Sequence, residues 1–277
     1  MMNDRLRSLF TTTPLRETAG LPDFRTDEEK ARAETQEASD AENAFKNFFK
    51  RWPRFYDRLA LTVAPILFTG LTGETFARRL SDDALLLNVG SGPMRLHPNS
   101  VNADLFPFRN VDVLAVAERL PFVDAAFDAI VCDQVLEHVE DPQAVIREMT
   151  RVLKPGGSLY IGVPFMYPLH PSPKDYARWS MDGVASLLPG FEIVESGPAM
   201  GPTSGLLTVL ADWLALVFSF GVRPLRKGLR YVFMLLLFPF KYLDLLFARY
   251  PGAETIAATV YLVAKKPTYA EASVDRR

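Results

Sequence analysis

The stretch Ala84–Pro93, ALLLNVGSGP, predicts how the rest of the chain is organised. Its first half is an unbroken aliphatic run, and a short apolar run that ends in turn residues is typical of a buried parallel strand. Gly90 and Gly92 then let the backbone turn sharply and approach a ligand without a side chain in the way. Because ligands of open α/β sheets bind outside the carboxyl ends of the strands, we expect a small-molecule site at residues 88–93.

A second predicted strand, Ser100–Ala103, ends in Asp104, about a dozen residues after the glycines. An acid at the tip of the neighbouring strand is placed to accept both hydroxyls of a ribose. A dinucleotide site would carry a third glycine and then a long helix for the pyrophosphate, but Arg95 stands at that position and no long helical pattern follows. The two features therefore favour a nucleoside without a pyrophosphate, and they count against an oxidoreductase that uses a dinucleotide.

The composition sets broad bounds. The 277 residues, 48% hydrophobic and 23% charged, suffice for one large α/β domain with an extension. A net charge of -2 gives no overall attraction to nucleic acid, so no nucleic-acid partner is expected. The single cysteine, Cys132, excludes an internal disulfide and any cysteine-based zinc site. The first thirty residues lack the apolar core of a signal peptide, which predicts a cytoplasmic protein.

The strand and helix signals alternate through the middle of the chain. A helix should begin at Asp141-Pro142, with the acid as N-cap, and end near Leu153 before a glycine turn. The connections at 90–99 and 105–110 are short for parallel crossovers, so we expect shortened or missing helices there. The expected strands are 84–89, 100–103, 111–115, 127–132, 158–163, 191–195 and 256–264.

The outer parts of the chain differ in composition from this core. Residues 1–40 are charged and lack apolar periodicity, which predicts a disordered tail. Aromatic residues at helical spacing in 45–52, and apolar helical patterns at 55–68 and 74–80, predict a helical extension that either packs on one face of the sheet or roofs the substrate pocket. The expected boundaries are 1–40 for the tail, 41–82 for this helical extension, 83–196 for the nucleoside-binding core, 197–253 for an apolar helical insertion, 254–267 for the last core strand and 268–277 for a second disordered tail.

Four motifs in unbroken order resemble those of the class I S-adenosylmethionine-dependent methyltransferases, in the type-11 methyltransferase group. They are LNVGSGP (87–93), NADLFPF (102–108), AERLPFVDAAFDAIVCDQVLEHVEDP (117–142) and REMTRVLKPGGSLYIGVP (147–164). The last strand, ATVYLVAKKP, is similar too. The resemblance implies an α/β fold with a Rossmann-like, seven-stranded, mostly parallel sheet whose last strand is antiparallel. It also implies S-adenosyl-L-methionine as the cofactor.

The resemblance assigns cofactor contacts position by position. It implies that the glycine turn approaches the methionine part of S-adenosylmethionine and that Asp104 accepts hydrogen bonds from its ribose hydroxyls. It also implies that residues 117–120 flank the adenine and that residues 133–135 line the floor of the cofactor site. Relatives commonly have an acid where Val116 stands, which implies one lost hydrogen bond to the adenine. The implied cofactor-binding residues are Asn88, Gly90, Ser91, Gly92, Asp104, Leu105, Ala117, Glu118, Arg119, Leu120, Asp133, Gln134 and Val135.

The candidate catalytic residues follow the fifth strand, in the proline-rich loop PFMYPLHPSPKDYARWS (164–180). They are His170, Asp175, Tyr176 and Arg178. Prolines stiffen such a loop, and functional residues gather on loops that a rigid scaffold holds. These residues either contact the acceptor and supply a base, or form an Asp175–Arg178 pair that staples the loop while His170 bonds to the backbone.

Glu137 and His138 form another candidate pair. The resemblance extends to quinone-biosynthesis relatives, in which a Glu, Glu, His set at this place can hold a metal. Gln134 stands where the first of those acids would be, so one charged ligand is missing and no metal is expected. The expectation is that Glu137 and His138 pack and hydrogen-bond beside the pocket.

The insertion contains two strongly apolar stretches, 206–220 and 229–247. Neither reaches the eighteen or so uninterrupted apolar residues of a membrane span. Lys227, Arg230, Lys241 and Asp244 should share one helical stripe. A wide apolar face with a thin basic stripe suits contact with a membrane interface through 204–248 at the inner face of the membrane, and it equally suits a buried cap or a homodimer face.

The sequence therefore predicts a methyltransferase that uses S-adenosylmethionine on an unidentified small-molecule acceptor, lipid-like or glycan-linked. In such enzymes the sulfonium already makes the methyl group electrophilic, so no fixed catalytic triad is expected. The alternatives are a non-catalytic nucleoside-binding scaffold of the same fold, and a fold relic without a ligand.

Overall fold

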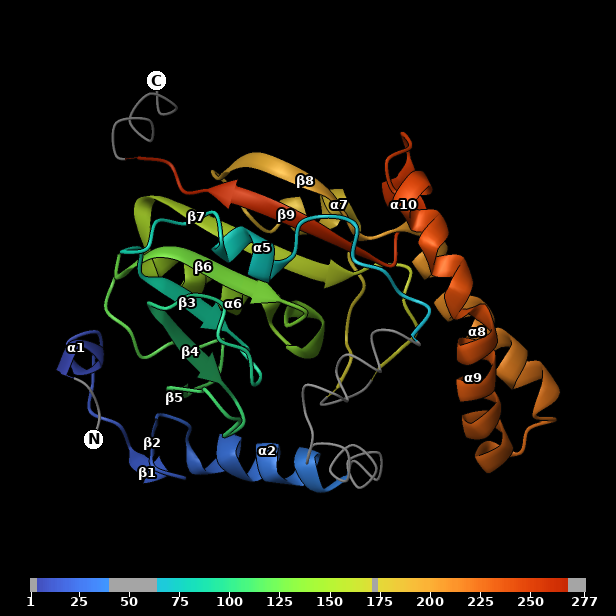
Figure 1. Cartoon of the computed structure of the whole chain (residues 1–277). Helices are drawn as coiled ribbons and strands as arrows, with labels where there is room; N and C mark the ends of the chain where they lie inside the picture. The colour runs from blue at the N-terminus through green and yellow to red at the C-terminus, as the bar shows by residue number, and fades with distance from the viewer. Residues whose placement is uncertain (1–3, 40–63, 171–173, 269–277) are drawn as a thin grey trace.

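The computed structural model describes residues 4–39, 64–170 and 174–268, which form a mixed sheet with helices on both sides (Figure 1). The nine strands follow the order β1-β2-β5-β4-β3-β6-β7-β9-β8. Their bounds are β1 Arg16–Thr18, β2 Leu21–Asp23, β3 Leu86–Val89, β4 Ser100–Asp104, β5 Val113–Leu114, β6 Phe127–Asp133, β7 Leu153–Pro164, β8 Glu192–Met200 and β9 Thr259–Lys265.

The strand that precedes the glycine turn, β3, lies near the middle of the sheet, and all four of its residues are buried. It pairs in parallel with β4 on one side and with β6 on the other. The last strand, β9, is antiparallel to both β7 and β8. The predicted Rossmann-like, mostly parallel sheet with an antiparallel last strand is confirmed, and two further strands extend it.

The helices that flank the sheet are short. They are η1 (Leu136–His138), α5 (Gly73–Ala77), α6 (Pro142–Val152) and α7 (Met181–Ala185). The α6 helix begins as predicted, because the Asp141 side chain accepts a hydrogen bond from the Ala144 N–H and Pro142 occupies the first helical position. The connections at 90–99 and 105–112 contain no helix, as their length predicts.

The prediction of a disordered tail is wrong for residues 4–39. They form α1 (Asp4–Arg7), the antiparallel hairpin of β1 and β2, and α2 (Asp27–Ser39). The β2 strand pairs in parallel with β5, so it continues the sheet at the blue end of Figure 1. Phe10 and Phe24 pack together, and Phe10 stacks on buried Phe122. A few isolated apolar residues anchor this segment, and they show no periodicity that a sequence pattern could detect.

The predicted helices at 45–52 and 55–68 lie mostly outside the described residues, as does the tail after residue 268. Residues 64–68 are described and are not helical; Phe68 instead makes an isolated bridge to Met200. The third predicted helix, 74–80, corresponds to α5.

The insertion is helical, as predicted. It comprises α8 (Pro202–Phe218), α9 (Arg223–Leu237), η2 (Phe238–Leu243), α10 (Asp244–Phe247) and η3 (Ala253–Ile256). Figure 1 shows these orange and red helices standing together at one end of the sheet. None of the helices among the described residues has both the length and the hydropathy needed to cross a bilayer.

The predicted stripe of four polar residues in the insertion is wrong. The chain leaves α9 at Leu237, so Lys241 and Asp244 do not continue the helical face of Arg230. Both are buried. The Asp244 carboxylate accepts hydrogen bonds from the N–H groups of Thr203 and Ser204, at 2.7 and 2.8 Å, and so caps the first turn of α8. The Lys241 ammonium donates to the Ala64 carbonyl.

Candidate functional site

The glycine turn follows β3 directly. Gly90 and Gly92 have φ angles of +63° and +53°, the left-handed region that glycine adopts without strain. A Cβ atom on Gly90 would lie 2.4 Å from Cγ2 of Val135, whereas a Cβ on Gly92 would meet nothing within 4 Å. Packing therefore excludes a side chain at Gly90, and the outer face of the turn at Gly92 is open.

Asp104 lies against this turn, at the end of the neighbouring strand β4. Its Oδ2 accepts a hydrogen bond from the Gly92 N–H at 2.7 Å, and its Oδ1 accepts one from the Phe106 N–H at 2.8 Å. Burial raises the pKa of this carboxyl, and the two N–H groups oppose that rise. Each carboxylate oxygen has a second lone pair, so Asp104 keeps acceptor capacity for hydroxyl groups. The structure thus brings together the two features that the sequence singled out.

Three of the residues assigned to cofactor binding hold the surrounding loops. The buried Asn88 points its amide toward the Met94 carbonyl, and the Ser91 hydroxyl donates to the Gly92 carbonyl at 3.2 Å. The Leu105 carbonyl accepts a hydrogen bond from the Arg25 guanidinium at 2.7 Å, and Arg25 forms a buried ion pair with Asp23. The N-terminal segment therefore braces the second strand-end loop.

The segment 117–120, which the resemblance places beside the adenine, contacts the N-terminal helix α2. Arg119 forms an ion pair of 2.8 Å with Glu29 of α2, and the Leu120 N–H donates to the Glu148 carboxylate. Burial raises the pKa of the Glu118 carboxyl, and nearby Glu29 raises it further. Ala117 is half-buried at the start of this segment. No sequence pattern predicts that α2 lies here, because residues 27–39 carry no apolar periodicity.

The segment 133–135 follows β6 and packs beneath the glycine turn. Gln134 has a φ of +57°, unusual for a residue other than glycine, and its N–H donates to the Gly162 carbonyl. This bend directs Val135 against Gly90. Asp133 accepts a hydrogen bond from the Gly73 N–H at 3.3 Å, and burial raises the pKa of its carboxyl to about 6.

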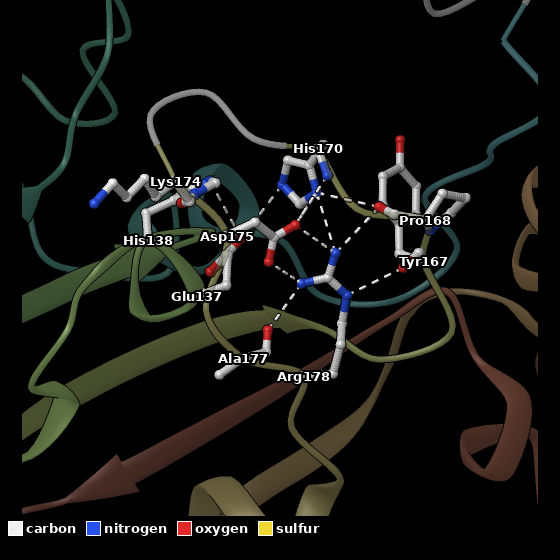
Figure 2. A network of polar contacts seen from close by, with 9 residues as sticks. All are labelled: Glu137, His138, Tyr167, Pro168, His170, Lys174, Asp175, Ala177 and Arg178. Carbon is white, nitrogen blue, oxygen red and sulfur yellow. Dashed lines mark hydrogen bonds and ion pairs between the residues drawn. The ribbon is translucent and has the colours of Figure 1, made fainter. Parts of the chain in front are cut away.

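The proline-rich loop after β7 is organised by an ion pair (Figure 2). The buried Asp175 carboxylate accepts two hydrogen bonds from the Arg178 guanidinium and one, of 2.9 Å, from the His170 N–H. Arg178 also donates to the carbonyls of Tyr167 and Pro168. Burial opposes ionisation of Asp175, but these hydrogen bonds outweigh it and lower the pKa of the carboxyl. The Asp175–Arg178 pair therefore staples the loop.

The staple places the His170 ring next to Glu137 and His138. Nε2 of His170 lies 3.7 Å from Oε1 of Glu137, and Nε2 of His138 lies 3.9 Å from the same oxygen. The Glu137 side chain is completely buried, and no described residue donates a hydrogen bond to either of its oxygens. The expectation that Glu137 hydrogen-bonds beside the pocket is therefore wrong. The cluster joins two segments that the sequence analysis treated separately.

Tyr176, the remaining catalytic candidate, does not join this cluster. Its side chain is 44% exposed, and its hydroxyl donates to Glu140 at 2.6 Å. Glu140 in turn pairs with Arg32 of α2. Tyr176 thus connects the loop to the N-terminal helix and lies away from His170.

The fold is a Rossmann-like domain in which the glycine turn and Asp104 meet at the carboxyl ends of β3 and β4. A family model described as a methyltransferase domain matches residues 95–161. A ubiquinone biosynthesis O-methyltransferase of Acinetobacter baumannii (strain AYE) is 27% identical over 110 residues, which cover 39% of this chain and 43% of the relative. A ubiquinone biosynthesis O-methyltransferase of Pseudomonas fluorescens (strain Pf0-1) is 31% identical over 112 residues, which again cover 39% of this chain and 43% of the relative.

Among solved structures, a possible histamine N-methyltransferase of Thermotoga maritima superposes with a TM-score of 0.43 at 17% identity, covering 79% of this chain and 99% of that one. Residues 95–161 therefore match a methyltransferase domain, and the curated relatives to which this part of the chain is similar are methyltransferases. The chain spans less than half the length of those two curated relatives.

Proposed function

We propose that the protein transfers the methyl group of S-adenosylmethionine to an oxygen of a bulky, amphipathic acceptor that it meets at a membrane surface. The contact between Gly92 and Asp104 supports the first part of this proposal, because it joins an open glycine turn to a carboxylate with remaining acceptor capacity at one sheet edge. The curated relatives are named O-methyltransferases, which supports an oxygen as the methyl acceptor.

The cofactor supplies the reactive methyl group, so the protein has to position an acceptor in line with it and exclude water. The floor segment 133–135 and the cluster at Glu137 follow one another along the chain after β6. The cluster therefore begins two residues beyond Val135, which packs on the glycine turn. This placement makes the loop after β7 the acceptor side of the site.

The helical insertion also reaches the acceptor side. A hollow is lined by Tyr167 and Pro168 of the loop and by residues of α8 and α9. Its wall combines apolar side chains with an ion pair between Asp212 and Arg230, whose closest atoms are 3.3 Å apart. Polar and apolar groups share this wall almost equally, and the cavity of about 20 Å³ holds little more than a water molecule, so the hollow marks only where the insertion meets the loop after β7.

The outer surface of the insertion is apolar in an unusual way. On α8 the buried side is built largely of small residues, among them Gly205, Ala211 and Ala215, whereas Leu206, Trp213 and other large side chains face outward. More large apolar side chains are exposed on α9, η2 and α10, for example Leu236, which is 62% exposed. A surface of this kind marks a contact with a partner or a membrane.

Charge favours an anionic bilayer as the occupant of this surface. Residues 202–249 contain six basic and two acidic residues, a net of +4 in a chain whose total is -2. Both acidic side chains are engaged, Asp212 by Arg230 and Asp244 by the start of α8. Arg223, Arg226 and Lys227 are exposed on the first turns of α9. Basic side chains beside exposed apolar ones are typical of helices that lie in a membrane interface.

Calorimetry with S-adenosylhomocysteine tests the cofactor site. The wild-type chain should bind it, and Asp104→Asn should bind about 10–100-fold more weakly, because a charge-assisted hydrogen bond contributes about 1–3 kcal/mol. Asp182→Asn, an exposed acid on α7, is the matched control and should bind like the wild type. A wild-type chain without binding heat would contradict the proposal. Binding without methyl transfer to any hydroxylated lipid would favour a scaffold instead.

Liposome flotation tests the membrane surface. The chain should float with vesicles that contain anionic lipid and remain behind with neutral vesicles at physiological salt. Arg226→Glu combined with Lys227→Glu should reduce the floated fraction, because each basic side chain near the surface contributes about 1 kcal/mol. Arg109→Glu combined with Lys265→Glu, two exposed residues elsewhere, should not. Equal flotation of both variants, or a dimer that never floats, would assign the apolar surface to protein contact.

A further inference from the structure

Glu137 is the most unusual ionisable residue among those described. Its side chain is completely buried, and neither carboxylate oxygen has a hydrogen-bond partner in the described part of the chain. Buried carboxylates are normally paired or hydrogen-bonded, because leaving a charged group unsatisfied away from water is costly. Within the residues that the structure describes, Glu137 therefore lacks the hydrogen-bond partners that a buried carboxyl group normally has, and a bound cation would take their place.

The two nearest groups are both imidazole rings. Nε2 of His170 and Nε2 of His138 lie 3.7 and 3.9 Å from the same Glu137 oxygen, too far for hydrogen bonds. One ligand atom from each of Glu137, His138 and His170 lies within 4.8 Å of the others. Two atoms that share an ion at about 2.1 Å each are at most about 4.2 Å apart, so both carboxylate–imidazole distances fit an ion held between them.

The other ring nitrogens are already occupied. Nδ1 of His138 lies 2.5 Å from the Lys174 carbonyl, which can only accept, so this nitrogen donates. Nδ1 of His170 lies 3.4 Å from two acceptors, the Asp175 carboxylate and the Pro168 carbonyl, and 3.5 Å from a guanidinium nitrogen of Arg178, which also holds that carboxylate in place (Figure 2). With the proton on Nδ1, each neutral ring points the lone pair of Nε2 toward Glu137. A carbonyl or carboxylate behind a histidine in this way is the usual support of a metal ligand.

We propose that Glu137, His138 and His170 bind a divalent first-row transition-metal ion. Two imidazoles and one carboxylate suit Zn²⁺ and its neighbours better than Mg²⁺, which prefers oxygen ligands in an octahedral arrangement. Three protein ligands leave a coordination position open. The His170 side chain is 33% exposed, so a further ligand can reach the ion from solvent.

This ligand set differs from the Glu, Glu, His pattern considered from sequence. Gln134 takes no part, and the third ligand comes from the loop after β7, about thirty residues further along the chain. The loop staple now has a defined role, because Asp175 and Arg178 position His170 by its ring and its N–H group. These two residues act as positioning residues.

The role of the ion rests on the proposed function. A bound acceptor hydroxyl would occupy the open position, and the ion would lower the pKa of that hydroxyl, so that the oxygen loses its proton before it attacks the methyl group. The methyl carbon would form a bond to this oxygen and break its bond to sulfur. The bonding electrons would remain on the sulfur as the neutral thioether, and the hydroxyl proton would go to solvent.

Binding of Zn²⁺ and Co²⁺ to the metal-free, folded chain tests the site. Calorimetry should show one high-affinity Zn²⁺ per chain, and Co²⁺ should acquire the visible absorption of a low-coordinate site. Glu137→Gln and His170→Ala should each weaken Zn²⁺ binding more than 100-fold, and the supporting variant Asp175→Asn about 10–100-fold. His97→Gln, which changes the one histidine of the chain outside the proposed site, should leave Zn²⁺ binding unchanged.

Two results would overturn the site. The first is a wild-type chain that takes up no Zn²⁺, which would leave protons on the two imidazoles as the charge opposite Glu137. The second is Zn²⁺ binding that survives in the folded His170→Ala variant. Because the His170 side chain is partly exposed, this variant should fold even if Glu137→Gln does not, and it therefore keeps the site testable. Binding of S-adenosylhomocysteine, measured on the same samples, reports separately on the methyl-donor site.

Discussion

Replacing Asp133 by Asn should change how the stability of the protein depends on pH. Asp133 is the last residue of β6, and burial raises the pKa of its carboxyl from 3.8 to about 6. The amide has the same shape and keeps an oxygen for the Gly73 N–H. The substitution therefore removes the titration and leaves the packing nearly unchanged.

The linkage between proton binding and folding determines whether stability rises or falls with pH. The pKa is higher in the folded state than in the unfolded state, so the folded protein holds this proton more tightly. Well below pH 3.8 the carboxyl is protonated in both states and costs nothing. Between pH 3.8 and about 6 the unfolded chain ionises while the folded protein keeps its proton, so stability is lost over this range and levels off once the folded carboxyl also ionises. Raising the pKa from 3.8 to about 6 corresponds to about 3 kcal/mol.

Urea denaturation at about pH 4 and about pH 7.5 measures this effect. The free energy of unfolding of Asp133→Asn, relative to the wild type, should be about 2–3 kcal/mol more favourable at the higher pH. Asp182→Asn, an exposed acid on α7, should show no such difference between the two pH values. A relative stability that is the same at both pH values, or that grows toward low pH, would refute the account of Asp133.

Three further substitutions test the packing around the site and the insertion. Asp244→Ala removes the carboxylate that caps α8 and should cost about 2–4 kcal/mol of unfolding free energy in urea, whereas an unchanged midpoint would show that α8 does not depend on this cap. Gly90→Ala should cost about 2–3 kcal/mol, because its Cβ meets Val135, and adding Val135→Ala should recover part of that loss. Strictly additive losses in this pair would contradict the contact. Gly92→Ala should cost only about 1 kcal/mol of stability, since its Cβ meets no atom, but it should lower the affinity for S-adenosylhomocysteine at least tenfold. A large loss of stability with unchanged affinity would place the ligand elsewhere.

The parts of the fold that the sequence predicts are those with strong local signals. The aliphatic run at 84–87 has no polar side chain that would favour exposure, and it leads into the buried strand β3. Asp141-Pro142 sets the start of α6 through one hydrogen bond and one fixed φ angle, both local effects. The glycine turn and Asp104 meet because parallel strands end at the same sheet edge.

The parts that it missed depend on contacts between distant residues. Residues 4–39 are held by a few aromatic contacts and by pairing with the short strand β5, and neither leaves a periodic pattern. Lys241 and Asp244 looked like surface residues on one helix, because the change from α9 to η2 is decided by packing. The position of His170 beside Glu137 depends on the Asp175–Arg178 pair and has no signature in spacing alone.

The central claim is that the glycine turn and the β4 carboxylate together bind the nucleoside of S-adenosylmethionine. A crystal structure of the chain with S-adenosylhomocysteine tests it most directly. The account predicts the ribose hydroxyls within hydrogen-bonding distance of Asp104, the amino-acid part along the open face of Gly92, and the sulfur directed toward the loop that holds His170. A ligand bound elsewhere, with Asp104 contacting only the N–H groups of Gly92 and Phe106, would contradict it.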